Sequence, residues 1–454
     1  MHSESTSGQS ELRLATRQNL PIDPVAIPVS HYVLGLATFT LLLVFALMNA
    51  APWVRGIDNR TGPVPPVVLL AFAWFAVSKA GGGIRESREA QPRVLAVIGI
   101  IATLGLLSAI WFSGNSWKAF FETIVLPLLT FAGVLSVRGV DLPRLGRCLN
   151  AVLFAVTTFQ LLQYIRIVHF SGFSPRFIFA NHYNVLLHNE FGRYSFGNSD
   201  NASVIFVTAL AVALVSARGA PNHRMRLFAY LSALTAAGAV YITGSRGALI
   251  SCLGAIVVAW WPATPARGRS RWGRSTALVI LLTLAGLSVW SVLKLQPIHV
   301  AGTSLSVRQE AMAVGVGLIV SHPLVGFGPA NVNDAVNAAA QNSLYSELAA
   351  TPGSAYNLFL NWGIGTGALS MILVVFLTLG AIRRCARAGK LWAAAPLAAF
   401  TIAGSTVGSS LVGVGNYSWS FLFWVCLALA WRPGWAIDAT NGRGMQQRLV
   451  RGSR

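Results

Sequence analysis

Long apolar runs dominate the 454-residue chain and constrain its fold more than any other feature. A helix needs about 20 residues to cross a hydrocarbon layer of ~30 Å, because each residue rises ~1.5 Å. The sequence therefore predicts an all-α, polytopic membrane protein with about twelve transmembrane helices. The expected spans lie near residues 31–50, 63–79, 94–113, 118–137, 148–168, 200–217, 225–243, 246–262, 275–293, 364–382, 391–412 and 416–432.

Lysine and arginine are distributed unevenly between the loops that these spans create. With both chain ends in the cytoplasm, 25 of the 34 basic residues fall in cytoplasmic segments and 9 in outer ones. This bias follows the enrichment of Lys and Arg in short cytoplasmic loops. It also explains the net charge of +20 without a nucleic-acid partner. We expect a transmembrane domain at 31–432 between cytoplasmic tails at 1–30 and 433–454, the second tail lying against membrane lipids.

Two outer connections, at about 167–199 and 294–363, are much longer than the others. Long ordered loops in compact proteins are commonly functional. Residues 304–321 have helical periodicity, and the Ala- and Asn-rich stretch 331–350 suits another surface helix. We expect short helices in these loops to form a cap over the outer end of the bundle. The apolar stripe expected on 304–321 consists of Leu305, Met312, Val316 and Ile319.

Three arginines are predicted to lie on the outer side near the lipid boundary, where an unpartnered charge costs up to ~2.5–3.5 kcal/mol. They are Arg193, Arg246 and Arg308. A guanidinium group contacts two phosphate oxygens at once, so converging arginines would suit a diphosphate. Alternatively, they are separate interfacial anchors or ion-pair partners of Glu190, Asp200 and Glu310.

Metal-binding patterns are missing from the sequence. The four cysteines lie in or beside apolar runs without metal-ligand spacing, which also argues against a disulfide framework. The outer segments contain no Asp-x-Asp pair and no histidine cluster with ligand spacing. We therefore expect no metal site and no cofactor, with arginine taking the place of a divalent ion.

Several outer motifs together resemble the O-antigen ligase and O-antigen polymerase superfamily of bacterial inner membranes. The resemblance extends from Arg193 to the tenth span, and its order, spacing and side of the membrane agree. The motifs are Arg193 with FGNSDN at 196–201, TGSRGA at 243–248, Arg308 followed by SHPLVGFGPAN at 321–331, and YNLFL at 356–360 followed by GIG at 363–365.

The resemblance implies a metal-independent membrane glycosyltransferase. Such an enzyme takes a glycan from undecaprenyl diphosphate on the periplasmic face and joins it to a hydroxyl of another glycan. Ligases use the lipid A-core as acceptor, whereas polymerases use another lipid-linked repeat unit. The catalytic candidates are Arg193, Arg246 and Glu190. The substrate-binding candidates are Arg308, Asn201, Ser245, His322, Gly326, Gly328, Tyr356 and Asn357.

One position departs from the family pattern and leaves the general base open. Ligases of this family usually carry histidine immediately before the asparagine of the fourth motif, and Tyr356 occupies that position here. A phenol with a pKa near ~10 is a poor base at neutral pH. Glu190, three residues before Arg193, is the leading candidate, unless it only pairs with that arginine. Weaker candidates are Glu347, Asp200, His182 and His188.

A twelve-helix transporter and a lipid flippase are the competing interpretations. Transporters commonly place ionisable residues and broken helices near the bilayer midplane, and a flippase needs a charged central cavity. The predicted spans are nearly free of charge at their centres, and the distinctive residues gather on one side. The sequence therefore favours chemistry at the membrane interface over transport.

Overall fold

A computed structural model describes helices along most of the chain and no strand within the described residues, which confirms the predicted all-α class for that part. The predicted spans 63–79 and 275–293 lie outside it, as does most of 31–50. The described residues are 35–41, 92–112, 116–137, 141–164, 199–243, 245–261, 304–341, 354–407, 411–412 and 417–436.

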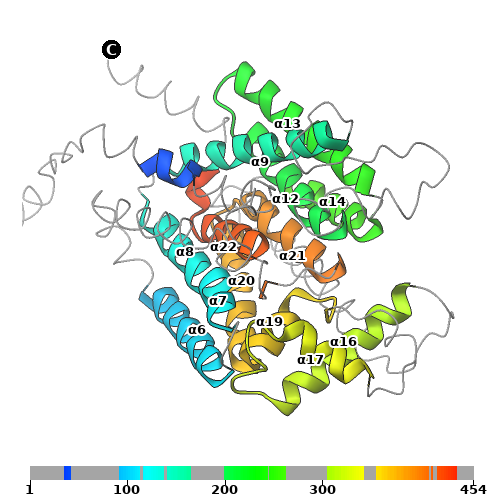
Figure 1. Cartoon of the computed structure of the whole chain (residues 1–454). Helices are drawn as coiled ribbons and strands as arrows, with labels where there is room; N and C mark the ends of the chain where they lie inside the picture. Colours follow the sequence, from blue (N-terminus) through cyan, green and yellow to red (C-terminus); the bar gives the residue numbers. More distant parts are fainter. Residues whose placement is uncertain are drawn as a thin grey trace, which may run out of the picture.

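The helices form a bundle and a smaller cap (Figure 1). The cap consists of α16 (Ser304–Ser321), α17 (Val332–Gln341) and α19 (Leu358–Thr366). The bundle consists of α6 (Pro92–Trp111), α7 (Ser116–Phe120), the π-helix η1 (Phe121–Val125), α8 (Leu126–Ser136), α9 (Leu142–Tyr164), α12 (Ser199–Arg218), α13 (His223–Thr243), α14 (Arg246–Ala259), α20 (Ala368–Arg387), the 3₁₀ turn η2 (Leu391–Ala394), α21 (Ala395–Val407), α22 (Tyr417–Trp431) and the 3₁₀ turn η3 (Pro433–Trp435).

Five of these helical stretches are long and apolar enough to cross a membrane: Arg93–Trp111, Trp117–Ser136, Leu142–Leu162, His223–Thr243 and Ala368–Arg387. Shorter apolar helices accompany them, among them Ala202–Arg218 and Ser418–Trp431. The chain is therefore a multi-pass membrane protein. The total of twelve spans stays a prediction.

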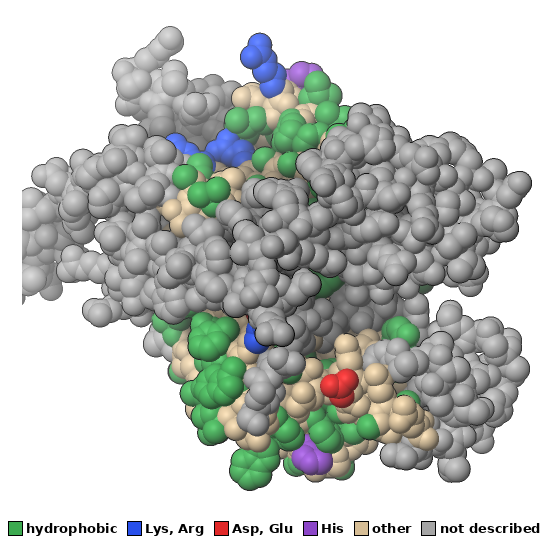
Figure 2. All heavy atoms as spheres, in the orientation of Figure 1, with side chains coloured by type: hydrophobic (Ala, Val, Ile, Leu, Met, Phe, Trp, Pro, Cys, Tyr) green, Lys and Arg blue, Asp and Glu red, His purple; other side chains and the backbone are tan. Residues whose placement is uncertain are grey.

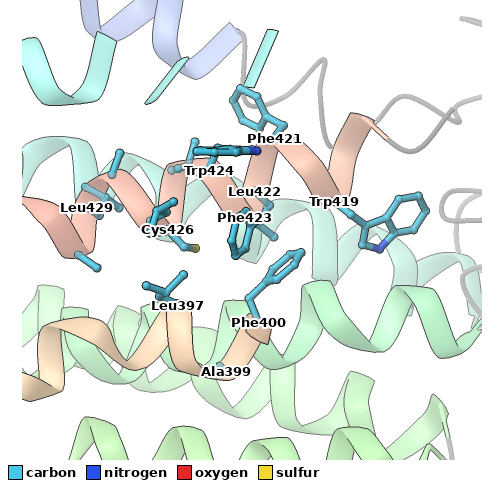
Figure 3. Packing of buried hydrophobic residues seen from close by; sticks show 14 of the residues in the cluster. Leu397, Ala399, Phe400, Trp419, Phe421, Leu422, Phe423, Trp424, Cys426 and Leu429 are labelled. Atoms are coloured by element: carbon cyan, nitrogen blue, oxygen red, sulfur yellow. The ribbon is translucent and has the colours of Figure 1, made fainter. Parts of the chain in front are cut away.

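The most apolar helices lie in the centre of the bundle. Every residue described on α22 from Ser418 to Ala430 is buried, and nearly all of α12 is buried as well. A helix that is apolar on all sides must be surrounded by other apolar groups. Figure 3 shows α22 packing against α21, where the rings of Phe400 and Phe423 lie 5.6 Å apart.

Peripheral helices leave large apolar side chains exposed. Leu234 on α13, Leu253 on α14 and Phe376 on α20 are each at least 65% exposed. Rows of this kind are too extensive for a surface in water. They fit contact with lipid tails, since a helix satisfies its own backbone hydrogen bonds there.

The tenth predicted span, 364–382, is displaced along the sequence. The chain breaks at Gly367, so residues 364–366 end α19 and the spanning helix α20 extends from Ala368 to Arg387. Gly367 has φ +91°, and a Cβ there would collide with the carbonyl of Leu324. The break therefore depends on a contact with a distant turn, which hydropathy along the sequence does not reveal.

The fifth predicted span, 148–168, begins six residues too late, because α9 starts at Leu142. Its first turns bury Leu142 and Leu145 and leave Arg144 exposed. An amphipathic turn of this kind lowers the local hydropathy, although it continues the same helix.

One end of the bundle gathers basic side chains, and we call it the basic end. The Arg218 guanidinium donates to the carbonyls of Ala259 and Trp261, 3.1 and 2.6 Å away. Arg432 donates to the carbonyls of Leu135 and Val137. These cations occupy helix C-termini, where carbonyls lack helical partners and the partial charge is negative. Figure 2 shows blue side chains concentrated at this end.

The cap lies at the opposite end, which we call the cap end (Figure 1). The Ser108 hydroxyl, near the end of α6, donates to the carbonyl of Gly365 on α19 at 2.9 Å. The rings of Phe112 and Phe327 lie 6.4 Å apart. On α17, Val332, Val336 and Ala340 recur every four residues and are buried, so α17 is an amphipathic helix on the cap surface.

We predict that Arg432→Met will destabilise the protein by about 1–3 kcal/mol, because two carbonyls at the end of α8 lose a charged donor. The matched control is Arg383→Met, since Arg383 is exposed on α20 near the same end. Thermal unfolding of both variants in detergent should show a clearly lower midpoint for the Arg432 variant alone. Equal midpoints would contradict a supporting role for Arg432.

Candidate functional site

The structure describes some of the predicted site residues in full, some only by their position in a helix, and two not at all. Glu190 and Arg193 lie outside the described residues. For Asn201, Arg246 and Arg308 it describes the helix positions but not the side chains. Side chains or backbone conformations are described for the others: Ser245, His322, Gly326, Gly328, Tyr356 and Asn357.

Arg246 is the first residue of α14. The buried Ser245 precedes it as N-cap, and its hydroxyl accepts from the amide of Ala248 at 3.5 Å. Thr243, at the end of α13, accepts from the Ser245 amide at 3.4 Å. The short TGSRG turn therefore places Arg246 where the amides at the start of a helix create partial positive charge.

Helices α12 and α14 run in the same direction. Both end at the basic end, where Arg218 on α12 bonds Ala259 at the end of α14. Their beginnings, which carry Asn201 and Arg246, therefore lie toward the cap end. The structure thus places two predicted site positions from different motifs at one end of the bundle.

Tyr356 adopts an unusual backbone conformation immediately before α19. Its φ is +47°, and it is the one residue other than glycine with positive φ in the part of the chain that the structure describes. A bulky side chain rarely adopts this conformation, which costs on the order of 1–3 kcal/mol. The surrounding contacts must therefore hold it in place.

Side-chain hydrogen bonds fix the segment around Tyr356. Asn357 caps α19 by accepting from the amides of Phe359 and Leu360 at 3.0 and 3.1 Å. Fully buried Asn361 accepts from the Ala355 amide at 2.9 Å. The Tyr356 amide donates to the Ser354 hydroxyl at 3.3 Å. Sequence analysis missed Asn361, although its spacing of four residues from Asn357 places both on one helix face.

Helix α16 packs across this segment through small residues. Ala311 packs with Tyr356 and with Ala340 of α17 in one apolar cluster. A Cβ added at Gly315, one turn later, would lie 2.8 Å from the Cβ of Ala355. Arg308 is one turn before Ala311 on the same row, so its position borders the Tyr356 cluster.

The apolar stripe predicted for 304–321 is partly revised by this packing. Met312 and Ile319 are buried as expected, whereas Val316 is only half-buried. Ala311 and Gly315 belong to the buried row instead. Their small size lets the two backbones approach, and a hydrophobicity pattern does not detect that requirement.

The beginning of α19 also contacts the bundle. A Cβ added at Gly404 on α21 would lie 3.2 Å from Cδ1 of Leu358. Helix α21 packs against α14, because a Cβ added at Gly254 on α14 would lie 3.0 Å from Cδ1 of Ile402 on α21. The beginnings of α12, α14 and α19 are thus at the cap end of one packed group. Their amide dipoles favour an anion there.

The turn at 322–329 lies at the other end of α16 from Tyr356. The Phe327 amide donates to the Ile364 carbonyl, and the Ala368 amide donates to the Pro323 carbonyl, both at 2.7 Å. Gly326 and Gly328 have φ of +64° and +90°. These glycines therefore allow a tight turn that docks on the junction of α19 and α20.

His322 is exposed at the start of this turn. Its Nδ1 lies 3.0 Å from the Ser321 hydroxyl, and its ring lies 4.1 Å from that of Phe327. Eleven helical positions separate it from Ala311, or roughly 16 Å along α16. The structure therefore separates His322, Gly326 and Gly328 from the group around Tyr356.

No group of three or more His, Cys, Asp or Glu side chains suited to a metal ion occurs among the described residues. Among the described residues, the groups at the start of α12, α14 and α19 include helix amides, the Arg246 position, amide side chains and the Tyr356 phenol, and the Arg308 position borders them. Such a set can bind an anion and hydroxyl groups.

One comparison with known proteins gives a match. Residues 231–375 match a family model described as O-Antigen ligase. The matched segment contains Arg246 and Arg308, but it begins after Glu190 and Arg193. No curated protein matches the chain.

We predict that Gly326→Ala will destabilise the cap by about 1–3 kcal/mol, because a Cβ there would overlap the Ile364 carbonyl and lie 2.8 Å from the amide nitrogens of Thr366 and Gly367. The control is Gly317→Ala, since Gly317 has open space around it in the interior of α16. Alanine there should stabilise the helix by about 0.5–1 kcal/mol. Hydrogen exchange of the cap should rise in the first variant only.

Proposed function

Because residues 231–375 place the chain in the O-antigen ligase superfamily, whose members are glycosyltransferase-like ligases or polymerases, we propose that it is a periplasm-facing glycosyltransferase of the inner membrane. It moves a glycan from undecaprenyl diphosphate to a hydroxyl of the lipid A-core, as an O-antigen ligase. The observation that supports this most is the common location of the α12, α14 and α19 beginnings at the cap end.

The orientation follows from the two ends of the bundle. Basic residues are enriched on the cytoplasmic side of membrane proteins, so the basic end faces the cytoplasm. The cap end then faces the periplasm, where lipid-linked glycans are joined. Both chain termini are proposed to be cytoplasmic, in agreement with the distribution of Lys and Arg along the sequence.

The arginines are proposed to stabilise the leaving diphosphate. The acceptor oxygen forms a bond to the anomeric carbon, the bond from that carbon to the diphosphate oxygen breaks, and the acceptor hydroxyl loses its proton. Negative charge develops on the departing diphosphate. Arg193 and Arg246, supported by Arg308 and the helix amides, stabilise that charge without a metal ion. Such preorganised charge contributes several kcal/mol in a site that excludes water.

The group around Arg308 and Tyr356 is proposed to hold the acceptor glycan. Fully buried Asn361 leaves its Nδ2 donor without a partner among the described residues. Amide side chains and aromatic rings are common partners of sugar hydroxyls and ring faces. Asn201 and Ser245, on the α12 and α14 side, are proposed to contact the donor.

Tyr356 favours polymerase as the second candidate. It occupies the position where ligases of the family usually carry histidine, and it packs against Ala311 and Ala340. A different side chain at this position fits an acceptor other than the lipid A-core, such as the lipid-linked repeat unit that a polymerase uses. Both candidates use the same donor and the same periplasmic site.

The arginine assignment predicts that Arg246→Ala will reduce the turnover of lipid-linked glycan in proteoliposomes by at least about 100-fold. Arg246→Lys should also be slow, because an ammonium group does not reproduce the two-pronged contact. Arg383→Ala, at the basic end, should transfer glycan normally. Near-normal transfer by both Arg193→Ala and Arg246→Ala would reject the diphosphate site.

Deletion of the gene in its host separates the two candidates. A ligase deletion should remove polymer-capped lipopolysaccharide while free polymer is still made. A polymerase deletion should leave a band with a single repeat unit. Gel analysis of surface polysaccharide distinguishes these patterns, and an unchanged pattern would exclude both.

A further inference from the structure

A buried carboxylate lies on the cap helix beside the proposed acceptor site. Glu310 is 9% exposed, although α16 is a helix of the cap. Val314 follows one turn later on the same face and packs against the cluster of Ala311, Ala340 and Tyr356. Glu310 therefore borders this cluster through its neighbours on the helix.

Glu310 and Arg308 border the cluster from two different rows. Arg308 shares a row with Ala311, whereas Glu310 shares a row with Val314. Ala311 belongs to the apolar cluster with Ala340, and Val314 packs against that cluster, as Tyr356 does. The Arg308 and Glu310 positions thus each lie one turn toward the start of α16 from a residue that packs in or against the Tyr356 cluster.

The other carboxylates with described side chains have different locations. Glu122 is buried within a membrane-spanning stretch, 3.9 Å from Lys118 of the same helix. Asp141 pairs with Arg144 at the basic end at 3.3 Å. Asp334 is exposed on α17. Glu310 is therefore the buried carboxylate at the cap end among these side chains.

We propose that Glu310 is the general base that accepts the proton of the acceptor hydroxyl, a role that rests on the proposed glycosyl transfer. The hydroxyl proton moves to the Glu310 carboxylate as the oxygen bonds to the anomeric carbon and the diphosphate leaves. A carboxylate can accept this proton directly. Tyr356, held rigidly by its neighbours, positions the acceptor against Glu310.

Charged and titratable residues close to Glu310 bear on how the transfer rate depends on pH. The other charged residue of α16 is Arg308, and Tyr356 is the titratable residue described just before α19. The buried residues of α17 are apolar, and α19 contains no titratable residue. The Glu310 carboxylate must be ionised to accept a proton, so the rate should fall as pH decreases through its pKa.

The test measures transfer kinetics of purified full-length protein in proteoliposomes with a lipid-linked glycan donor and saturating acceptor. Glu310→Gln should lower kcat by at least about 100-fold with little change in KM, and the acidic limb of the kcat profile should disappear. Asp334→Asn is the matched control and should keep wild-type kcat and limb. Glu190→Gln should also retain the acidic limb.

The outcomes separate this inference from the proposed function. Wild-type kcat and an unchanged acidic limb in Glu310→Gln, or loss of that limb in Glu190→Gln instead, would overturn the role of Glu310 alone. If the wild-type protein transfers no glycan, the proposed function fails and the inference fails with it. If Glu310→Gln does not fold, Glu310→Asp should show an at least tenfold lower kcat with the acidic limb retained, and wild-type kcat there would overturn the role.

Discussion

The helix ends at the two faces of the bundle impose the main physical constraint on this protein. A helix leaves amides unpaired where it begins and carbonyls unpaired where it ends, and a membrane interior offers them no water. At the basic end, Arg218 and Arg432 donate to such carbonyls. At the cap end, Ser245 and Asn357 accept from such amides. The bundle therefore has cations at one end and the beginnings of α12, α14 and α19 at the other.

This polarity gives the cap end its proposed chemistry. Helix beginnings attract anions, and side-chain caps satisfy only part of the free amides. In the proposed function, Arg246 and Arg308 add full charges to the same region. The proposed diphosphate donor carries the negative charge that such a region would attract.

Close backbone contacts bring the cap helices together with each other and with the bundle. Gly315 lets α16 approach Ala355, and Gly404 lets α21 approach Leu358. Tyr356, between these contacts, keeps a strained backbone conformation and packs against Ala311 and Ala340. The glycine-rich turn with Gly326 instead fixes the junction of α19 and α20, some distance away. The motif around Gly326 and the motif around Tyr356, which follow each other in the sequence, therefore have different roles in the fold.

Local patterns were sufficient to predict several helices from the sequence. Residues 304–321 and 225–243 show clear apolar periodicity or length, and α16 and α13 occupy nearly the same ranges. The break at Gly367 was not predictable, because it depends on the carbonyl of Leu324 from a separate turn. The burial of Glu310 was missed as well, because burial depends on how α16 packs in the fold and not on the residue pattern of α16 alone.

The sequence by itself determined that this is a helical multi-pass membrane protein with motifs that resemble the O-antigen ligase family, because hydropathy, charge bias and motif order are properties of the chain. Only the tertiary structure decided which outer residues meet. It placed Tyr356 against Ala311 and Ala340, with His322 at the other end of α16, because contacts between distant segments depend on how helices pack at glycine and alanine positions. Periodicity within one helix carries no information about that packing.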